Sequence, residues 1–254
     1  MNTLDTRSLD LGRLNSATKY PSIPTYHTLG DRGALLEEHI EFLDHPLIYT
    51  EKVDGTNSRI ILMPDSCYVM GSREELLNAR GDLVHNPALG IVETLRETAE
   101  KLSNEPRDTI TVLYLETYGG KITGASKNYT GQTLVGYRLF DACRIDAEVL
   151  NREPLQIAGW REAGGQAYFT EFELQEYAEH TGLLLAPRIA AGARLPESIA
   201  DVHTWLESAI PKTLVALDDT AKGVPEGIVV RTPDRQRIAK IRFEDYQRHR
   251  KRLS

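Results

Sequence analysis

The segment from Tyr49 to Asn57 most constrains the fold, because it places a lysine between two stretches of strand-forming residues. The preceding run, residues 46–50, is rich in β-branched and aromatic side chains, and Asp54-Gly55 is a strong turn dipeptide. Residues 59–63 and 67–71 predict two further strands, separated by a turn. The pattern therefore predicts a meander in which Lys52 ends the first strand, backed by rigid structure and open to a pocket.

A reactive lysine in this position needs help from its surroundings. Its amine attacks only when neutral, and a reference pKa of about 10.4 keeps it protonated near neutral pH. Burial and neighbouring cations lower a lysine pKa. Arg73, Lys240 and Arg242 are candidate cations, and they are also candidates to hold a phosphate chain. The alternative is a solvated lysine before a hairpin turn, a common setting for Lys-x-Asp-Gly.

The composition is that of a globular chain, and 254 residues fit one unit of about 230 to 250 residues. It contains neither an apolar run long enough to cross a membrane nor a signal peptide after Met1, so we expect a cytoplasmic protein. Cys67 and Cys143 lie in apolar runs without CxxC spacing, which indicates core packing. A net charge of −7 argues against unspecific coating of nucleic acid, although eight Lys or Arg residues between Arg235 and Arg252 allow a local basic groove.

The rest of the chain divides into an arm, a body and a tail. Residues 1–18 lack apolar periodicity and predict an irregular arm, residues 19–246 predict the catalytic body, and residues 247–254 predict a short basic tail. Helical spacing of apolar residues predicts helices over 31–43, 86–103, 170–180 and 196–210. Asn86 is a candidate cap for the second of these helices. Residues 183–189 predict a short strand.

Two carboxylates stand where strands begin or end, and two cations share one later strand. Glu116 closes the apolar strand 109–118, and Glu226-Gly227 precedes a β-branched run. In the strand 237–243, Lys240 and Arg242 share one face by the period of two. A phosphate between them would explain two adjacent cations that otherwise repel. The alternatives are a glutamate solvated at a strand end and an edge strand protected by charges.

The sequence Lys52-Val53-Asp54-Gly55-Thr56-Asn57 resembles the nucleophile motif of covalent nucleotidyltransferases, specifically the ATP-dependent RNA ligases of the phage RNA ligase 2 type. In DNA ligases and capping enzymes an arginine usually stands five places after the lysine. Asn57 takes that place here, and Arg59 follows two residues later, which favours an RNA ligase. The start Lys19-Tyr20-Pro21-Ser22-Ile23 and the segments around Glu116, Phe140, Glu226 and Lys240 resemble further family motifs, in the family's order.

The resemblance implies an α+β protein with the adenylyltransferase (nucleotidyltransferase) fold: mainly antiparallel sheets, flanking helices and a nucleotide pocket between the sheets. It also implies a three-step reaction. Lys52 attacks the α-phosphorus of ATP to form a lysyl-AMP intermediate, the AMP passes to a 5′-phosphate on RNA, and a 3′-hydroxyl displaces AMP to seal the strand.

The same resemblance assigns roles to individual residues. It implies that Asp54 orients Lys52 or activates the attacking hydroxyl, and that Lys240 and Arg242 offset negative charge on the phosphates. The backbone around Glu51 would contact the adenine edge. The remaining assignments place Asn57 in the cofactor-binding set, Arg73 on phosphate or nucleic acid, Glu116 on the ribose hydroxyls, Phe140 against the adenine, and Glu226 on Mg²⁺ or Mn²⁺, directly or through water.

Three of these residues also have structural explanations. Arg73 could pair with Glu74 or Glu75 on the surface. Phe140 could be a core residue, as phenylalanines in strands often are. Glu116 could be solvated at the rim of its strand.

The expected partner is RNA with 5′-phosphate and 3′-hydroxyl ends, and an end-healing kinase-phosphatase is a candidate partner that would supply such ends. We expect no membrane partner. Residues 247–254 are too few for the OB-fold domain of DNA ligases and capping enzymes, so the chain is expected to be a catalytic core without that domain. A GTP-using capping enzyme is disfavoured for the same reason. Two alternatives stay open: a DNA or nick-sealing ligase core, and a catalytically idle RNA-binding module. The set Lys52, Glu116, Glu226 and Lys240 speaks against idleness, because a binding module needs cations but not these carboxylates.

Overall fold

The computed structural model describes residues 5–42, 46–79, 82–84, 90–191 and 194–253. Its α-helices are α1 (Leu11–Thr18), α2 (Ile91–Ser103), α3 (Pro154–Glu162), α4 (Glu171–Thr181), α5 (Ile199–Ala209) and α6 (Phe243–Leu253). Its strands are β1 (His27–Leu29), β2 (Leu35–His39), β3 (Ile48–Lys52), β4 (Thr56–Leu62), β5 (Tyr68–Ser72), β6 (Leu76–Ala79), β7 (Asp82–Leu83), β8 (Ile110–Gly119), β9 (Val135–Ile145), β10 (Ala167–Tyr168), β11 (Gly227–Arg231) and β12 (Ile238–Arg242).

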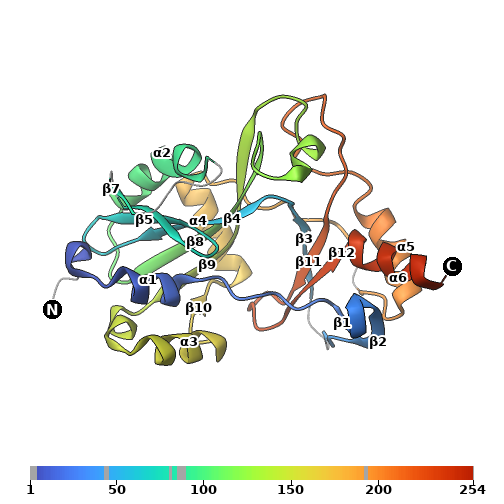
Figure 1. The fold of residues 1–254 in the computed structure, drawn as a ribbon, viewed down its shortest axis with the longest axis horizontal. Helices are drawn as coiled ribbons and strands as arrows, with labels where there is room; N and C mark the ends of the chain where they lie inside the picture. Colours follow the sequence, from blue (N-terminus) through green and yellow to red (C-terminus); the bar gives the residue numbers. More distant parts are fainter. Residues whose placement is uncertain (1–4, 43–45, 80–81, 85–89, 192–193, 254) are drawn as a thin grey trace.

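A seven-stranded antiparallel sheet, in the order β10-β9-β8-β4-β5-β6-β7, forms the larger half of the molecule (Figure 1). Helices cover both of its faces, with α2 and α4 on one and α1 and α3 on the other. The alternation of side chains along β4 explains this sandwich, because Ile60 and Leu62 enter one core while Ile61 and Met63 enter the other. Each such side chain, fully buried, contributes about 1.5 to 3 kcal/mol.

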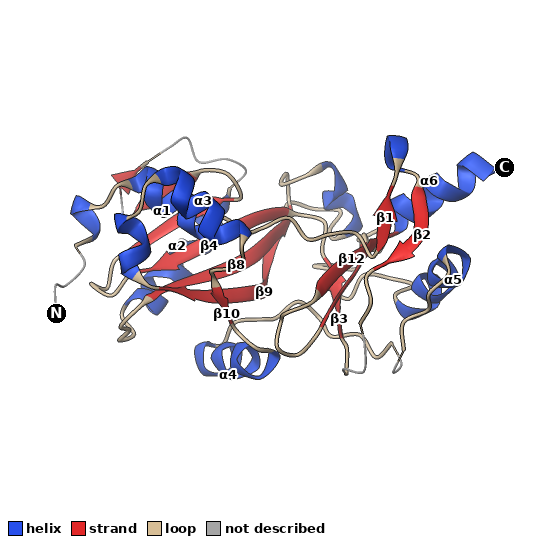
Figure 2. Cartoon of the chain, turned by 90° about the horizontal axis from the view of Figure 1, so that it is seen from below, coloured by secondary structure: helices blue, strands red, loops and turns tan. Residues whose placement is uncertain are grey.

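A smaller antiparallel sheet, in the order β12-β11-β3, forms the other half (Figure 2). One of its faces packs on a separate apolar core that includes Ile228, Ile241, Val202 and Leu206, the last two from α5. The hairpin of β1 and β2 and the helix α6 complete this core. The opposite face of the small sheet, which carries Lys240, is therefore left to meet the large sheet.

The two sheets are joined covalently at the lysine motif. Lys52 ends β3 and pairs with Gly227 in the small sheet, whereas Thr56 begins β4 and pairs with Thr117 in the large sheet. The meander predicted from the sequence is therefore wrong for its first strand. Antiparallel pairing of β4 with β5 is confirmed, but β3 pairs with β11, far away in sequence. The turn at residues 53–55 crosses from one sheet to the other.

A buried ionic network also joins the two halves. Arg231 on β11 contacts Asp141 on β9 at 3.5 Å and Glu171 on α4 at 2.6 Å. Arg235, in the turn between β11 and β12, lies 2.8 Å from the second oxygen of Asp141, and Tyr20 donates to that oxygen at 2.8 Å. Removing one partner from such a network leaves a buried charge and typically costs about 3 to 5 kcal/mol.

Two sequence predictions for the amino-terminal region are wrong. The supposedly irregular arm contains α1, which begins because the Asp10 carboxylate accepts hydrogen bonds from the backbone N–H groups of Gly12 and Arg13. The predicted helix over 31–43 is instead strand β2, which pairs with β1. Its apolar spacing misled the prediction, because Leu35 is buried while Leu36 is 43% exposed, as alternation in a strand requires.

Other boundaries shift or change. Helix α2 begins at Ile91 after Gly90, and the predicted cap Asn86 lies outside the described residues. Residues 183–189 form only isolated bridges, at Leu185 and Arg188. Most of the predicted basic tail continues helix α6 as far as Leu253. The helices predicted over 170–180 and 196–210 are confirmed as α4 and α5.

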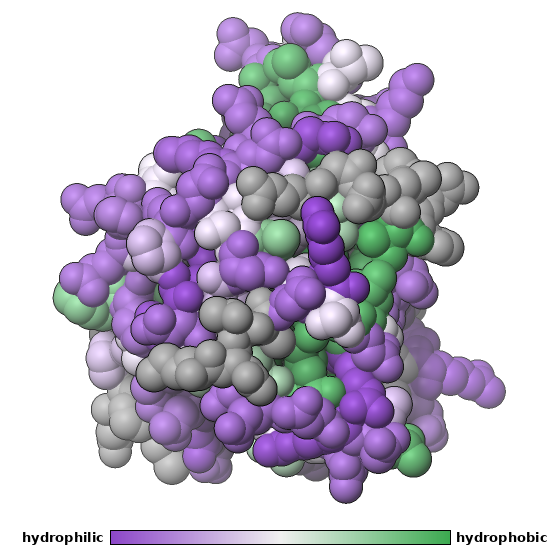
Figure 3. All heavy atoms as spheres, turned by 90° about the vertical axis from the view of Figure 1, so that its left-hand side faces the viewer, coloured by the Kyte–Doolittle hydropathy of each residue, from purple (hydrophilic) through white to green (hydrophobic). Residues whose placement is uncertain are grey.

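The surface shown in Figure 3 is mainly hydrophilic, with small separate apolar areas. Among the described helices, none combines the length and the apolar character needed to cross a bilayer. Cys143 is buried in the core between the large sheet and α1 and α3, as its apolar run predicted, and Cys67 packs partly buried against the same core. Both are free thiols.

His27 makes the packing of the small half sensitive to acid. Its Nδ1 lies 2.7 Å from the Tyr246 hydroxyl and its Nε2 lies 2.8 Å from the Glu197 carbonyl oxygen. Burial lowers the pKa of His27. A histidine whose pKa is lower in the folded than in the unfolded protein contributes its full stabilisation above the unfolded pKa of about 6.5. This stabilisation is lost as the pH falls through the folded pKa.

We therefore predict that the free energy of unfolding falls between pH 7.5 and pH 5.5, and falls less in His27→Gln. Urea unfolding at both pH values measures this difference. His180→Gln, at a position whose side chain is 72% exposed, is the control and should behave as wild type. An equal fall in wild type and His27→Gln would contradict the assignment.

Candidate active site

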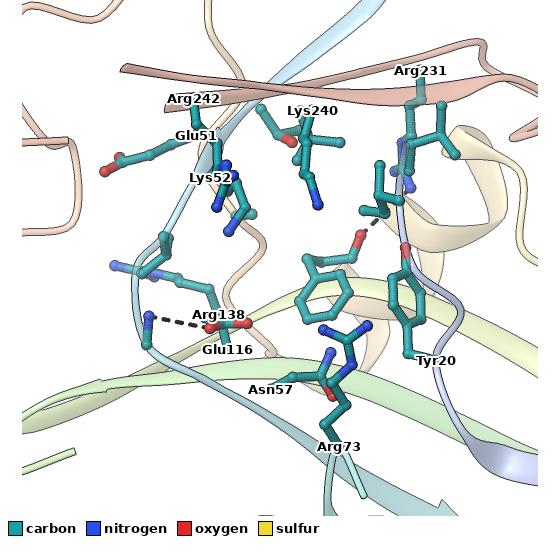
Figure 4. Close-up of a pocket in the computed structure, with 18 of the residues that line it drawn as sticks. Tyr20, Glu51, Lys52, Asn57, Arg73, Glu116, Arg138, Arg231, Lys240 and Arg242 are labelled. Atoms are coloured by element: carbon teal, nitrogen blue, oxygen red, sulfur yellow. Dashed lines mark hydrogen bonds between the residues drawn. The ribbon is translucent and has the colours of Figure 1, made fainter. Parts of the chain in front are cut away.

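A cavity of about 440 Å³ lies between the two sheets, and the lysine motif forms part of its wall (Figure 4). Most of the residues proposed from sequence line it: Glu51, Lys52, Asn57, Arg73, Glu116, Phe140, Lys240 and Arg242. Asp54 and Glu226 lie beside the cavity rather than on its wall. The fold thus brings together residues from five strands and a loop that are scattered over nearly 200 positions of the sequence.

Lys52 reaches the cavity because alternation along β3 turns Lys52 and Thr50 toward it. Its Nζ lies 2.6 Å from Oε2 of Glu226, the residue just before β11. This short ion pair holds the lysine side chain against the residue that precedes β11. Burial nevertheless raises the pKa of Glu226, against the lowering effect of Lys52.

Glu116 faces the same turn from the large sheet. Its Oε1 accepts the backbone N–H of Gly55 at 3.1 Å (dashed in Figure 4). Burial raises the pKa of Glu116 to about 8, and the nearby carboxylates of Glu226 and Asp54 add to the rise while Lys52 opposes it. Glu226 and Asp54 therefore both lie close enough to Glu116 to disfavour its ionisation.

The two cations of β12 lie on one face of the strand, as predicted. Strand register places Lys52, Gly227 and Arg242 in one row across the small sheet. Only glycine fits in the middle of that row, because an added Cβ at Gly227 would lie 2.0 Å from the Ile241 carbonyl oxygen. Burial, followed by the charges of Arg242 and Lys52, lowers the pKa of Lys240.

Arg242 is partly engaged already. Its guanidinium donates two hydrogen bonds to the buried carboxylate of Asp245 in the first turn of α6, both at 2.8 Å. Such a two-point contact fixes the orientation of the guanidinium. Arg242 still lines the cavity, with its charge partly neutralised.

The remaining predicted residues occupy different parts of the wall. Phe140 both lines the cavity and packs against the core, so the two interpretations of this ring are compatible. The Asn57 side-chain oxygen is buried without a hydrogen-bond partner. Arg73 donates to the Ser22 hydroxyl at 2.8 Å and lies 3.7 Å from Glu74, half-exposed at the rim.

The side chain of Glu51 does not point toward the cations of β12, although its neighbour Lys52 lies in the cavity wall. Its carboxylate is buried and points away from Lys240 (Figure 4). It accepts hydrogen bonds from the Thr213 hydroxyl and from the Leu214 N–H, the latter at 2.8 Å. Burial raises its pKa in spite of these two donors.

Sequence reasoning did not single out three wall residues, Tyr20, Arg138 and Arg231. Strand alternation could have predicted Arg231, because it shares a face with Val229 on the strand that follows Glu226, and both line the cavity. Arg138 lies directly across from Glu116 in the large sheet. Tyr20 could be placed only by its long-range contacts, since it belongs to an extended segment with no periodicity.

The carboxylates suit a hard divalent cation, although none of the described His, Cys, Asp and Glu residues form a ready-made cluster of three metal ligands. Besides burial, the charges of Glu226 and Asp54 raise the pKa of Glu116, and the charge of Asp54 raises that of Glu226. A cation would relieve this repulsion. Mg²⁺ typically takes one or two carboxylates and completes its shell with water and phosphate oxygens. The donor set therefore fits such an ion, with Glu226 the residue nearest to Lys52.

Comparison with known proteins identifies the family. A model of the RNA ligase family matches residues 45–242, which include the whole set from Lys52 to Arg242. The chain belongs to the RNA ligase family. A search of curated proteins found no match.

Solved structures of Naegleria gruberi RNA ligase share the fold of this RNA ligase family member. A lysine-to-methionine mutant with AMP and Mn superposes with a TM-score of 0.52 at 15% identity, over 81% of this chain and 52% of that chain. A glutamate-to-alanine mutant with ATP and Mn gives a TM-score of 0.54 at 14% identity, over 92% and 63%. The present chain thus spans about half to two thirds of the length of these proteins. The predicted fold, with antiparallel sheets and outer helices, is confirmed.

The raised pKa of Glu116 has a measurable consequence for stability. Below its unfolded pKa of about 4.3, this carboxyl is protonated in both states and does not change the free energy of unfolding. As the pH rises toward its folded pKa of about 8, the unfolded state ionises more readily, so the folded state is increasingly destabilised. Glutamine keeps the shape and the acceptor for Gly55 N–H but cannot ionise.

We predict that Glu116→Gln becomes more stable than wild type as pH rises from 5.5 to 8, measured by chemical unfolding. Glu97→Gln, on the exposed face of α2, is the matched control and should show no pH-dependent gain. A constant difference between Glu116→Gln and wild type across this range would show that Glu116 titrates normally.

Proposed function

We propose that this protein is an ATP-dependent RNA ligase that transfers AMP to its own Lys52 and then to a 5′-phosphate RNA end. The observation that supports this proposal best is the position of Lys52 in the cavity wall, between the carboxylates of Glu116 and Glu226 and the cations of β12. The family match covers all these residues. The AMP, ATP and Mn in the structures of Naegleria gruberi RNA ligase support the choice of ATP and of Mg²⁺ or Mn²⁺ as cofactors.

In the first step, Lys52 Nζ attacks the α-phosphorus of ATP. An N–P bond forms, the P–O bond to pyrophosphate breaks, and the amine loses a proton. The short pair with Glu226 opposes this attack, because it engages the Lys52 amine. Glu226 must therefore release Lys52 before the reaction. A divalent ion bound by Glu226 would supply positive charge at the phosphate.

The other residues bind and orient the nucleotide. Phe140 and Val229 line the cavity from opposite sheets, and Glu116 lines it as well. In this proposal the first two enclose the base, and Glu116 accepts hydrogen bonds from ribose hydroxyls. Lys240, with its lowered pKa, and Arg242 offset charge on the phosphates. Asp54 orients Lys52 or activates the incoming hydroxyl. The backbone of Glu51 contacts the adenine edge, and Asn57 completes the nucleotide-binding set. Arg73, at the rim, contacts phosphate or RNA.

The later steps complete the ligase reaction. The AMP on Lys52 passes to a 5′-phosphate RNA end, and a 3′-hydroxyl displaces AMP to form the phosphodiester. A local basic stretch around β12 and α6 would hold RNA in spite of the net charge of −7. We further propose that the enzyme is cytoplasmic and of the phage RNA ligase 2 type. An end-healing kinase-phosphatase could supply the RNA ends that it joins.

The first test is covalent labelling. We expect the wild-type protein to retain label from α-labelled ATP, but not from GTP, through denaturing electrophoresis. Lys52→Ala and Lys52→Arg should both lose the label, since alanine removes the nucleophile and arginine keeps only its charge. Lys121→Ala, an exposed lysine, is the control and should label normally. An unlabelled, folded wild-type protein without pre-bound AMP would exclude this function and favour an RNA-binding module.

The second test concerns the metal. EDTA should abolish labelling, and Mg²⁺ or Mn²⁺ should restore it. Glu226→Gln should need about 10- to 100-fold more Mn²⁺ for half-maximal labelling, because the charged ligand is lost. Glu97→Gln serves again as the control. An unchanged Mn²⁺ requirement in Glu226→Gln would show that this carboxylate does not hold the ion.

A further inference from the structure

Two loop segments pair with each other at the edge of the cavity. Residues 123–131, between β8 and β9, and residues 213–223, before β11, run side by side (Figure 1, top), and we call them the clasp. Three backbone hydrogen bonds connect them: Leu217 N to Tyr129 O at 2.7 Å, Lys222 N to Lys127 O at 2.9 Å, and Gly223 N to Asn128 O at 3.0 Å. The clasp is thus a pair of hydrogen-bonded loops outside the main sheets, and the first loop contains a short 3-10 helix, Gly124–Asn128.

A side chain fastens the tip of the clasp. The Asp218 carboxylate accepts hydrogen bonds from the Thr130 hydroxyl and, at 3.4 Å, from the Gly131 N–H. Thr220 also accepts from the Gly131 N–H, at 3.0 Å. Asp218 does not line the cavity. The two segments are therefore held together at a point that is separate from the proposed chemistry.

The clasp holds the chain on both sides of Lys52. On the amino-terminal side, Thr213 and Leu214 donate to the carboxylate of Glu51. On the carboxyl-terminal side, the Tyr129 hydroxyl oxygen accepts the backbone N–H of Asp54 at 2.6 Å. Contacts from one element thus bracket the proposed nucleophile.

Tyr129 is fixed by its own packing. It is fully buried, its ring lies 4.9 Å from that of Tyr118, and it forms a small apolar cluster with Val53, Tyr118 and Val215. Burial raises its pKa, so the hydroxyl stays neutral and can act as an acceptor. The next N–H along the turn, that of Gly55, is held by Glu116. Two side chains therefore fix two consecutive peptide N–H groups, two and three residues after Lys52.

We propose that Tyr129 is a positioning residue for the nucleophile, and that the clasp sets the conformation of the Lys52–Gly55 segment through it. This inference rests on the proposed nucleotidyl transfer to Lys52. Tyr129 is not one of the residues that line the cavity in which we propose that ATP binds. Its effect is on the attack by Lys52 and not on nucleotide binding, because a small displacement of a reacting group slows a reaction more than it weakens binding.

Tyr129→Phe tests this role, since phenylalanine keeps the ring packing and removes only the acceptor. We expect the maximal rate constant of self-adenylylation to fall about 2- to 10-fold, the usual net value of one hydrogen bond, with an unchanged KM for ATP. Hydrogen exchange at the Asp54 amide should become faster. Tyr177→Phe is the control, because Tyr177 is a partly buried tyrosine that packs on the core between the large sheet and α2 and α4. It should alter neither the rate constant nor the exchange of the Asp54 amide.

The outcomes separate the two proposals. If the wild-type protein labels and Tyr129→Phe labels at the same maximal rate, the positioning role is wrong while the proposed function stands. A higher KM with an unchanged maximal rate would also overturn it. Absence of labelling in the wild type would overturn the proposed function, and the inference with it.

A double-mutant cycle tests the clasp without relying on Tyr129→Phe alone. Asp218→Ala unfastens the tip, and we expect it to slow adenylylation by the same route. The double variant Tyr129→Phe/Asp218→Ala should then be no slower than the slower single variant, because the second change acts through a contact that is already lost. Effects that multiply would show that the two residues act independently, and a wild-type rate in Asp218→Ala would show that the clasp does not act on Lys52.

Discussion

The structure depends on one covalent constraint: three residues separate the end of β3 in the small sheet from the start of β4 in the large one. Lys52 pairs with Gly227 on one side of this crossing, and Thr56 pairs with Thr117 on the other. The two sheets must therefore lie close together at this point, and the space between them becomes the cavity. Lys52 is exposed to that space because it is the last residue before the crossing.

Buried charge keeps the two walls at a fixed separation. The contacts of Arg231 with Asp141 and Glu171 connect β11 to β9 and α4 without passing through the lysine motif. The proposed active site, by contrast, holds carboxylates that burial makes costly to ionise, such as Glu116. The protein thus combines an ion-paired network that reaches the cavity wall at Arg231 with carboxylates in or beside the same cavity whose pKa values are raised. Strongly shifted pKa values of this kind cluster at functional sites.

The sequence predicted those parts of the fold that depend on local pattern. β-branched runs located β8, β9, β11 and β12, and the period of two placed Lys240 and Arg242 on one face. Prediction from the sequence failed where contacts with residues far away in the chain determine the structure. Residues 35–39 fit either period until pairing with β1 is known, and nothing near Lys52 shows that β3 belongs with β11. Arg138 and Tyr129 were missed as contributors to the site because only the folded chain brings them to the lysine motif.

The central claim is that the cavity between the sheets delivers the α-phosphate of ATP to one amine, that of Lys52. Tandem mass spectrometry of peptides from protein treated with ATP and Mn²⁺ tests it most directly. The account predicts a single adenylyl group, attached to Lys52. An adenylyl group on Lys240 or another residue, or none on protein shown to be folded and initially free of AMP, would contradict it.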